Sequence, residues 1–191
     1  MKERPIPFKK PMVRALLDGS KTQTRRVVKP APQMVTDKTI APWDGDPAAL
    51  MRALEQSGKR CPFGQPGDQL WVREAWKAHT TFDHLPPRDI PPSHVWYMAD
   101  DGYKAESRYR QGMFMPRWAS RIMLEVVSVR IERLQDISEA DAKAEGCAVW
   151  PECEAPAAYN LYSALWESIN GPGSWDANPW VWVVEFKRIT P

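Results

Sequence analysis

The sequence contains no apolar run long enough for a membrane-spanning helix, and its first residues include no apolar signal-peptide region. We therefore expect no membrane partner and no secretory signal. Cysteine is scarce: Cys61, Cys147 and Cys153 are an odd number without framework spacing, which favours a reducing, cytoplasmic location. Because no C-x-x-C and no H-x-x-x-H pair occurs, we expect no metal site.

Glycine-rich nucleotide-binding loops are missing too. Neither G-x-G-x-x-G nor G-x-x-x-x-G-K-[ST] is present, which excludes the commonest phosphate-binding loops and leaves no cofactor to expect. Charge of one sign is also not in excess, because 26 Lys and Arg face 24 Asp and Glu for a net charge of +2. A nucleic-acid site would therefore be a local patch rather than a property of the whole surface.

The abundant residues are tryptophan and proline. The 191 residues suffice for one domain with a sizeable core, and 19 prolines predict long loops. Alternating or β-branched segments indicate five or six strands, whereas helical periodicity and capping residues indicate short helices between them. We expect strands at 5–9, 22–28, 69–76, 95–98, 120–134 and 180–189, and helices at 11–18, 47–57, 140–145 and 159–169.

This order of elements has no β-α-β rhythm, which argues against a doubly wound parallel sheet. The segment 120–134 is apolar on both sides, as a central or strongly curved strand requires. In the helix at 159–169, Leu161, Leu165 and Trp166 form the apolar stripe. We therefore predict an α+β fold, a small and partly open mixed β-barrel decorated by helices.

Residues 19–26, with the sequence GSKTQTRR, are the most informative segment for function. They follow a helix that Gly19 ends, and they place Lys21 beside the hydroxyl of Thr24 and the guanidinium groups of Arg25 and Arg26. A cation beside a hydroxyl can hold an anion or activate the hydroxyl as a nucleophile. The alternative is a solvated basic strand at the edge of a sheet.

Several spaced motifs together resemble one known family. They are the Gly-x-Lys-Thr-x-Thr-x-Arg segment after the first helix, the Gly67-Asp68 turn before a strand, and the closing Val183-Val184-Glu185-Phe186 strand. Their order resembles the ASCH domain of the PUA-like superfamily. The sequence motifs at 70–74, 115–121, 141–146 and 178–180 resemble those of its long, prophage- and phage-encoded branch. The resemblance spans almost the whole chain as a single domain, 1–191, with insertions at 29–65 and 79–112.

The resemblance implies a PUA-like pseudo-barrel with a cleft that faces RNA or a nucleoside. One bacterial relative is an amidohydrolase that removes the acetyl group from N(4)-acetylcytidine. Its catalytic lysine and threonine fall on Lys21 and Thr24, and Arg26 is also matched. Its catalytic glutamate falls on Glu145, although the local sequence there differs from the relative's. On chemical grounds Lys21 would accept a proton only if its pKa is lowered, and Glu145 could instead be a solvated helix residue.

Other side chains are candidates on their own chemistry. Glu74 lies in an apolar strand, so it either lines the same cleft or pairs with a cation such as Arg121. Arg117, Trp118 and Arg121 could contact phosphate and stack a base, or they could pack in the barrel. Asp68 is expected to close a turn. The tryptophans at 175, 180 and 182 are expected to pack in the core or at its rim.

Three functions follow as hypotheses. The leading one is a module that binds RNA or a modified nucleoside, with hydrolysis of that ligand left open. The second is an amidohydrolase acting on N(4)-acetylcytidine-like nucleosides through Lys21, Thr24 and Glu145. The third is a ribonuclease. A closed pocket one base wide favours the amidohydrolase, whereas an open basic groove favours the binding module or the nuclease.

Overall fold

The computed structural model describes residues 1–35, 39–100, 106–147 and 157–189, so Cys153 lies outside the described residues. Within them the strands are β1 (Glu3–Pro7), β2 (Gln23–Val27), β3 (Gln33–Val35), β4 (Ile40–Pro42), β5 (Gln69–Arg73), β6 (Trp76–Ala78), β7 (Val95–Tyr97), β8 (Met123–Arg133) and β9 (Trp180–Ile189). The α-helices are α1 (Lys10–Asp18), α2 (Pro47–Gln56), α3 (Glu139–Ala144) and α4 (Ala157–Asn170). No helix in these ranges is both long and apolar enough to cross a membrane.

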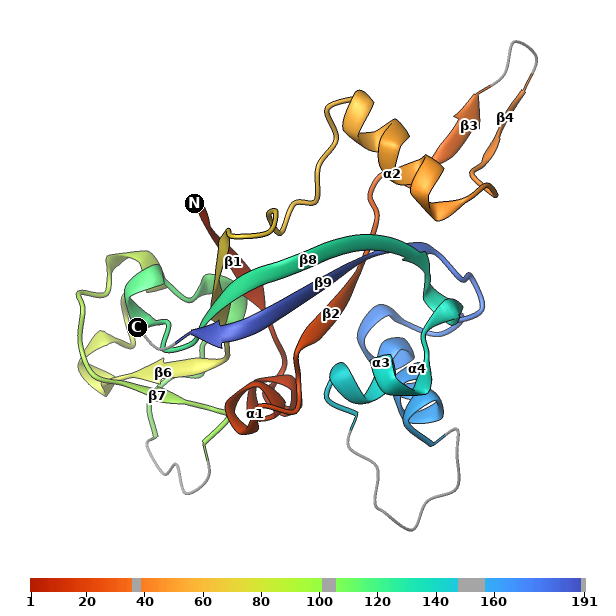
Figure 1. Ribbon diagram of the computed structural model, residues 1–191. Helices are drawn as coiled ribbons and strands as arrows, with labels where there is room; N and C mark the ends of the chain where they lie inside the picture. Colours follow the sequence, from red (N-terminus) through yellow and green to blue (C-terminus); the bar gives the residue numbers. More distant parts are fainter. Residues whose placement is uncertain (36–38, 101–105, 148–156, 190–191) are drawn as a thin grey trace.

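A mixed five-stranded sheet forms the centre of the molecule. Its strand order is β1-β5-β8-β9-β2, with β1 parallel to β5 and the other neighbours antiparallel. Figure 1 shows β8 and β9 as an arch with α1, α3 and α4 beneath it and with α2 and the β3–β4 hairpin above it. The prediction of a small α+β fold is therefore confirmed.

The long strand β8 owes its curvature to a bulge. Its register with β9 shifts between Val126 and Ser128, and the side chain of Val127 at the shift is 50% exposed. One extra residue in a strand reverses which face the following side chains occupy. Val126 before the bulge and Ile131 after it both enter the main core. This is why the sequence of β8 is apolar on both sides.

Strand β9 is buried on both of its faces. Trp180, Trp182, Val184 and Phe186 pack into the main core, whereas Val181 and Val183 pack beneath α3 and α4 in a second cluster. The third expected packing tryptophan, Trp175, contacts Tyr159 and Tyr162 edge to face. Burial on both faces fixes the position of β9 and, through its pairing with β2, of the segment that follows Gly19.

The sheet does not close between its two edge strands, β1 and β2. Instead, the guanidinium of Arg26 on β2 donates a hydrogen bond to the carbonyl oxygen of Pro7 on β1, at 2.7 Å. The same guanidinium lies 5.3 Å from the ring centroid of Phe8. A side chain thus bridges the gap that backbone hydrogen bonds leave open, and the gap gives access to the space between the strands and α4.

The two segments expected to be insertions are built differently. In 29–65, Leu50 and Leu54 of α2 join the main core, while the β3–β4 hairpin extends away from it (Figure 1). In 79–112, Ile90 and Val95 form a small separate cluster together with Trp76 and residues 115–119. Asp68 closes the turn before β5 as expected, because its carboxylate accepts the backbone N–H groups of Lys2 and Gln65.

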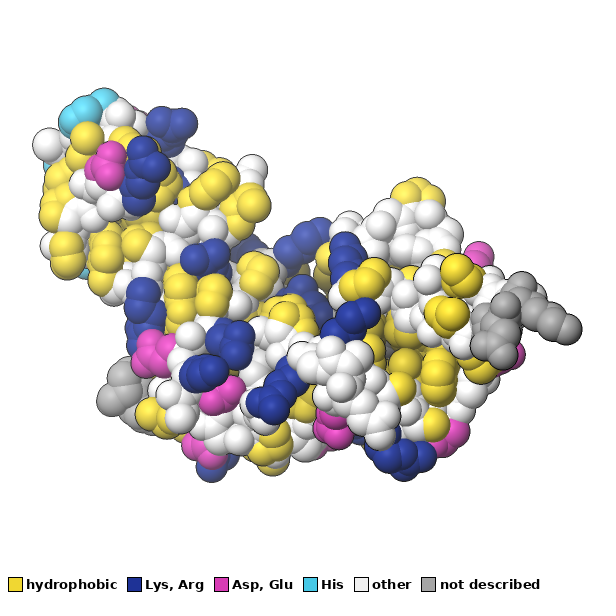
Figure 2. Space-filling view, turned by 90° about the horizontal axis from the view of Figure 1, so that it is seen from above, with side chains coloured by type: hydrophobic (Ala, Val, Ile, Leu, Met, Phe, Trp, Pro, Cys, Tyr) yellow, Lys and Arg dark blue, Asp and Glu magenta, His cyan; other side chains and the backbone are white. Residues whose placement is uncertain are grey.

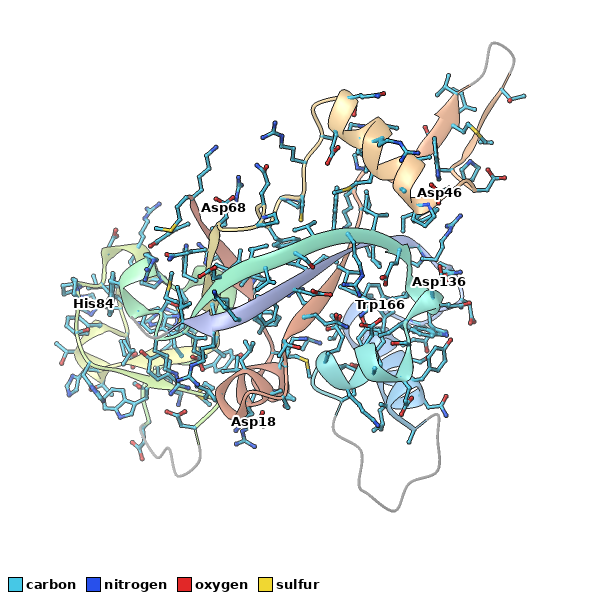
Figure 3. All side chains as sticks on the ribbon, viewed as in Figure 1. Asp18, Asp46, Asp68, His84, Asp136 and Trp166 are labelled. Atoms are coloured by element: carbon cyan, nitrogen blue, oxygen red, sulfur yellow. The ribbon has the colours of Figure 1, made fainter. Side chains whose placement is uncertain are left out.

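Helix α4 differs from its predicted packing. Leu161, expected in the apolar stripe, is 48% exposed, and the buried positions are Ala158, Tyr162 and Trp166. These three residues are four apart, so they lie on one helix face. Figure 3 shows Trp166 among the elements beneath the arch of β8. A tyrosine therefore takes the central buried position of this helix.

Candidate functional site

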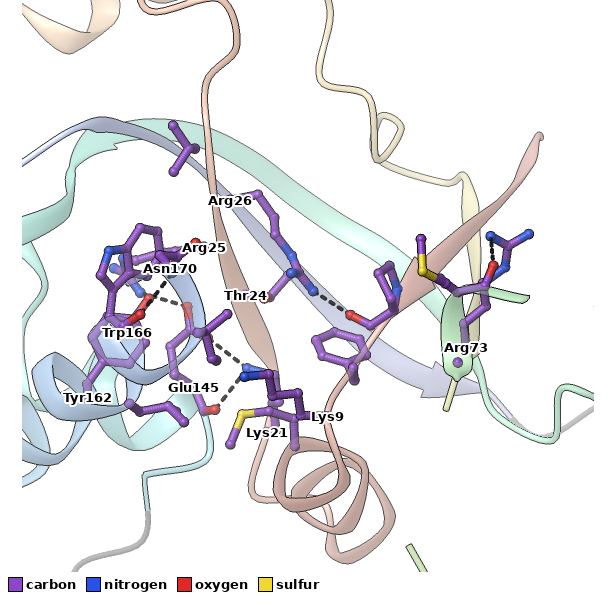
Figure 4. A pocket seen from close by; sticks show the side chains of 18 residues that line it. Lys9, Lys21, Thr24, Arg25, Arg26, Arg73, Glu145, Tyr162, Trp166 and Asn170 are labelled. Carbon is purple, nitrogen blue, oxygen red and sulfur yellow. Dashed lines mark hydrogen bonds and ion pairs between the residues drawn. The ribbon is translucent and has the colours of Figure 1, made fainter. Parts of the chain in front are cut away.

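A cavity of about 300 Å³ lies in the gap between α1, β2, the end of α3 and one face of α4. Figure 4 shows that its side chains come from both ends of the chain. Its lining comprises Pro7, Phe8, Lys9, Met12, Lys21, Thr24, Arg25, Arg26, Val27, Arg73, Gly112, Met113, Glu145, Tyr162, Leu165, Trp166, Ile169 and Asn170. This volume is at the lower end of the range for small-molecule sites.

The backbone holds Lys21 in place at the floor of the cavity. Gly19, at φ +84°, ends α1 in the left-handed conformation, and the N–H of Lys21 then bonds to the carbonyl of Ala15. Lys21 and Glu145 form an isolated antiparallel bridge. Gly146 allows this close approach, because a Cβ there would lie 2.7 Å from the Cβ of Ala15. The end of α3 is therefore held against the start of β2.

The Lys21 side chain is buried and directed at Glu145. Its Nζ donates to the Glu145 carboxylate Oε2 at 2.7 Å and to the Glu145 carbonyl oxygen at 2.8 Å. An ammonium group has three hydrogens, so these bonds use two of them. Burial lowers the pKa of Lys21, although the Glu145 carboxylate opposes this shift. The arrangement holds a lysine in an environment that favours loss of its proton.

The second oxygen of Glu145 is held by Arg25, whose guanidinium side chain has no exposed surface. Arg25 donates to Glu145 at 3.3 Å, and also to Glu132 at 2.9 Å and Asp141 at 3.2 Å. Arg130 extends this network, because it pairs with Glu132, Asp141 and Glu185. Arg25 therefore positions Glu145 within this network of ion pairs.

Two hydroxyl groups face the cavity beside this pair. Thr24 and Tyr162 line the cavity and are each 4% exposed, and neither hydroxyl hydrogen-bonds to any described residue. Burial raises the pKa of Tyr162 well above its usual value, and the Glu145 carboxylate adds to this shift. The tyrosine therefore stays protonated and can donate to a ligand. Thr24 offers a hydroxyl in the same space as the Lys21 amine.

Three further cationic side chains, Lys9, Arg26 and Arg73, line the cavity together with mostly apolar residues. The mostly buried Arg26 has an Nε without a partner among the described residues, and burial lowers its pKa. Exposed Lys9 donates to the carbonyl of Ser168 at 3.3 Å, linking the start of α1 to the last turn of α4. Arg73 lies at the right of Figure 4, across the cavity from Tyr162 and Trp166 at the left.

Sequence reasoning missed the contribution of α4. Tyr162, Trp166 and Asn170 line the cavity at a spacing of four residues, with Leu165 and Ile169 between them. The available signal was an aromatic and polar series within an amphipathic helix, which we interpreted as core packing. Their position could not be derived without knowing that α4 covers the gap between the sheet edges.

Glu74 requires a correction, because it does not line the cavity. It is 2% exposed, and its carboxylate accepts from Arg121 Nε at 2.9 Å and from a second nitrogen of Arg121 at 3.1 Å. Arg121 also pairs with Asp100 and lies 3.9 Å from the ring centroid of Tyr97. Burial raises the pKa of Glu74, and Arg121 counters the shift. The ion pair weighed as the alternative is the arrangement that the structure has.

The cluster expected to contact phosphate and a base is also corrected. Arg121 pairs with Glu74 and Asp100, and Arg117 pairs with Glu3 at 2.7 Å. Trp118 lies edge to face with Trp76 at 6.1 Å between ring centroids, as part of the third hydrophobic cluster. None of the three lines the cavity. Lys21, Thr24, Glu145, Arg25 and Arg26 are thus the predicted residues that the structure brings together.

Comparisons with known proteins add little to this geometry. No family model matches the chain, and no curated protein matches it. Among solved structures it is similar to protein EF3133 from Enterococcus faecalis V583, family-model DUF984, with a TM-score of 0.41 and 10% identity. The similarity covers 92% of this chain and only 65% of that one. Within the described residues, no three His, Cys, Asp or Glu side chains are grouped to hold a metal ion.

Proposed function

We propose that the cavity binds a modified nucleoside and hydrolyses an acyl-amide bond on its base, as an ASCH-type amidohydrolase acting on N(4)-acetylcytidine-like substrates. The observation that carries the proposal is the buried Lys21–Glu145 pair in a cavity that Thr24 also lines. It supports the role of these residues that the resemblance implies. The cytoplasmic location expected from the cysteines remains part of the proposal.

The reaction begins with a proton shift within the pair. Glu145 accepts a proton from the Lys21 ammonium, which leaves a neutral amine in the buried site. As the Thr24 oxygen attacks the acyl carbonyl carbon, Lys21 takes the hydroxyl proton. When the tetrahedral intermediate collapses, the C–N bond breaks and Glu145 returns its proton to the leaving amine of cytosine. Arg26 stabilises the negative oxygen.

Water completes the cycle. Lys21, deprotonated again through Glu145, takes a proton from water as the water oxygen attacks the threonine ester. The C–O bond to Thr24 then breaks, a carboxylic acid leaves, and Lys21 passes the proton it took from water to the threonine oxygen. Glu145 then returns its own proton to Lys21, which restores the starting ion pair. The step needs no metal or redox partner, because atoms and charges balance within the substrate, water and these three side chains.

The geometry favours hydrolysis over the two alternatives. Three of the arginines predicted to contact RNA, Arg25, Arg117 and Arg121, each pair with a carboxylate and so have that partner already. The cavity, of about 300 Å³, also has a volume within the range of small-molecule sites. RNA binding through other residues remains an outcome that the following experiment can reveal.

The test measures acetate release from N(4)-acetylcytidine by wild-type protein and by Thr24→Val and Thr24→Ser. We expect turnover by wild-type protein, none by Thr24→Val, and partial activity by Thr24→Ser, which keeps a hydroxyl. Thr24→Val is nearly isosteric, so its thermal unfolding curve should match wild type. Absence of turnover on acylated cytidines by wild-type protein, combined with salt-sensitive binding of short RNAs, would replace the proposal with the binding module.

A further inference from the structure

A second cavity, of about 510 Å³, adjoins the first and is formed largely by the segment 29–65. The two cavities share Arg26, Val27 and Asn170 in their linings. Arg26 lies between two rings, at 5.3 Å from the centroid of Phe8 in the first cavity and 5.8 Å from that of Phe63 in the second. A ligand that fills both would therefore pass beside this guanidinium.

The lining of the second cavity is cationic. Arg26, Lys29, Lys59 and Arg60 contribute to it, and no Asp or Glu does. Seen from above in Figure 2, Lys and Arg side chains gather around the hollow in the middle of this face, whereas acidic side chains lie toward its edge. Such a concentration of positive charge in a concave surface attracts anions.

Apart from Arg26, the cations that line the second cavity have no ion-pair partner among the described residues. Lys29, Lys59 and Arg60 are exposed and form no ion pair with any described residue. Glu55, the nearest acidic neighbour in sequence, lines a third cavity beside Lys59 and Arg60 without pairing with either. By contrast, Arg25, Arg117 and Arg121 are each held by a carboxylate.

We propose that Lys29, Lys59 and Arg60 bind a phosphate group of the substrate, so that the site takes a nucleotide rather than a free nucleoside. The inference rests on the proposed function for the base, which would lie in the first cavity. Sugar and phosphate then extend past Arg26 into the second. The phosphate could belong to a free mononucleotide or to a single strand, and the two sources share the same chemistry at these three cations.

The test compares binding of five probes by calorimetry: cytidine, its 5′-monophosphate, its 3′-monophosphate, ribose 5-phosphate, and a trinucleotide with a central cytidine. We expect one of the monophosphates to bind about 10- to 100-fold more tightly than cytidine, the range for one hydrogen bond between charged groups. In the triple variant Lys29→Gln, Lys59→Gln, Arg60→Gln this preference should vanish, while the affinity for cytidine stays unchanged.

A matched control removes the same charge elsewhere. Lys10→Gln, Arg52→Gln and Lys143→Gln alter three exposed residues that line none of the three cavities, so this variant should keep the phosphate preference. Thermal unfolding of both variants should match wild type, because all six side chains are exposed. A trinucleotide that binds more tightly than either monophosphate identifies a strand as the source of the phosphate.

The outcomes separate this inference from the proposed function. Equal affinity for cytidine and both monophosphates, or a preference that survives in the triple variant, would overturn the phosphate site, whatever the turnover of N(4)-acetylcytidine. Ribose 5-phosphate carries no base, so its binding tests the cations alone. If it binds to wild type and not to the triple variant, while no cytidine compound is bound or hydrolysed, the phosphate site stands and the proposed function fails.

Discussion

Two carboxylates of this protein are equally buried and differ in what surrounds them. Glu145 is 3% exposed and Glu74 is 2% exposed, and each is held by a cation. Next to Glu74, the hydroxyl of Tyr97 has a hydrogen-bond partner, because it donates to the backbone carbonyl of Ala119. Glu145 lies beside a cavity where the hydroxyls of Thr24 and Tyr162 have no partner among the described residues.

The comparison shows that burial of a paired carboxylate does not by itself identify a reactive site. Both pairs satisfy the requirement that a buried charge be compensated. What distinguishes Glu145 is that polar groups next to it remain available to a ligand in a space large enough to hold one. The following predictions test this distinction, beginning with the largest expected effect.

Replacing the carboxylate at the cavity should abolish most of the activity. We expect Glu145→Gln to lower the rate of N(4)-acetylcytidine hydrolysis by about 10²–10⁴-fold, the usual cost of losing one general acid or base. The matched control is Glu74→Gln, which removes the other buried carboxylate and should leave kcat/KM unchanged. Equal losses of activity in the two variants, measured at a temperature where both are folded, would contradict the distinction.

Removing the cation of the other pair should affect stability and not activity. In Arg121→Met, Glu74 is left buried without its partner, so we expect the free energy of unfolding to fall by about 3 kcal/mol, the low end of the range for breaking a buried pair. We take the low end because the Arg121 side chain is 25% exposed. Urea denaturation measures the change. A fall in kcat per folded molecule would indicate that Arg121 also serves the cavity.

The two pairs should respond to pH with opposite signs. Burial lowers the pKa of Lys21 below its usual 10.5, so the folded state binds fewer protons than the unfolded state in the alkaline range below that value. The free energy of unfolding should therefore rise with pH there. The rate of hydrolysis should instead fall as the Lys21–Glu145 pair loses its proton, because Glu145 then has no proton to give to the leaving amine. In Lys21→Met, both the pH dependence of the free energy of unfolding and that of the rate should disappear.

For Glu74 the pKa is raised above its usual 4.5. Its contribution is therefore fully present below pH 4.5 and is lost as the pH rises through the raised value, so the free energy of unfolding should fall there by at most about 1.4 kcal/mol per pH unit. Comparing wild type with Glu74→Gln by urea denaturation between pH 4 and 7 isolates this slope. A wild-type slope of the opposite sign in this window would mean that the ion pair with Arg121 outweighs burial.

The smallest effects are expected for the two tyrosine hydroxyls. Tyr97→Phe removes a hydroxyl that donates to Ala119 at 3.0 Å, so it should cost about 1 kcal/mol of stability and leave KM unchanged. Tyr162→Phe removes a hydroxyl that bonds to no described residue, so it should leave stability almost unchanged and raise KM. The reverse pattern, measured by thermal unfolding and steady-state kinetics, would place the ligand outside this cavity.

Much of the fold could be predicted from local patterns. Strand β9 begins and ends as the alternation at 180–189 indicates, and α2 follows its proline start closely. The bulge in β8 could not be located, because a shift of one residue depends on pairing with β9 rather than on the sequence around Val127. Leu161 was placed in the core because an apolar residue fits either face until the packing of the helix is known.

The site was predictable only in its local part. Lys21 and Thr24 belong to one short segment, and the structure shows that both line the same cavity. Their spacing alone does not predict this, because residues three apart in an extended strand point to opposite faces. Glu145 lies 120 residues from Arg25, and Glu74 lies 47 residues from Arg121, and composition does not reveal which carboxylate pairs with which cation. The assignment of Glu145 came from the resemblance, whereas that of Glu74 to the same cleft came from burial alone and was wrong.

The lysine at the floor of the cavity is anchored by a peptide group as well as by a side chain. Its Nζ bonds to the carbonyl oxygen of residue 145, which every amino acid at that position would present. A descendant that lost the carboxylate would thus lose proton transfer while retaining a lysine fixed in the same place. Binding could outlast catalysis in such a lineage, so one scaffold can serve both enzymes and inactive receptors.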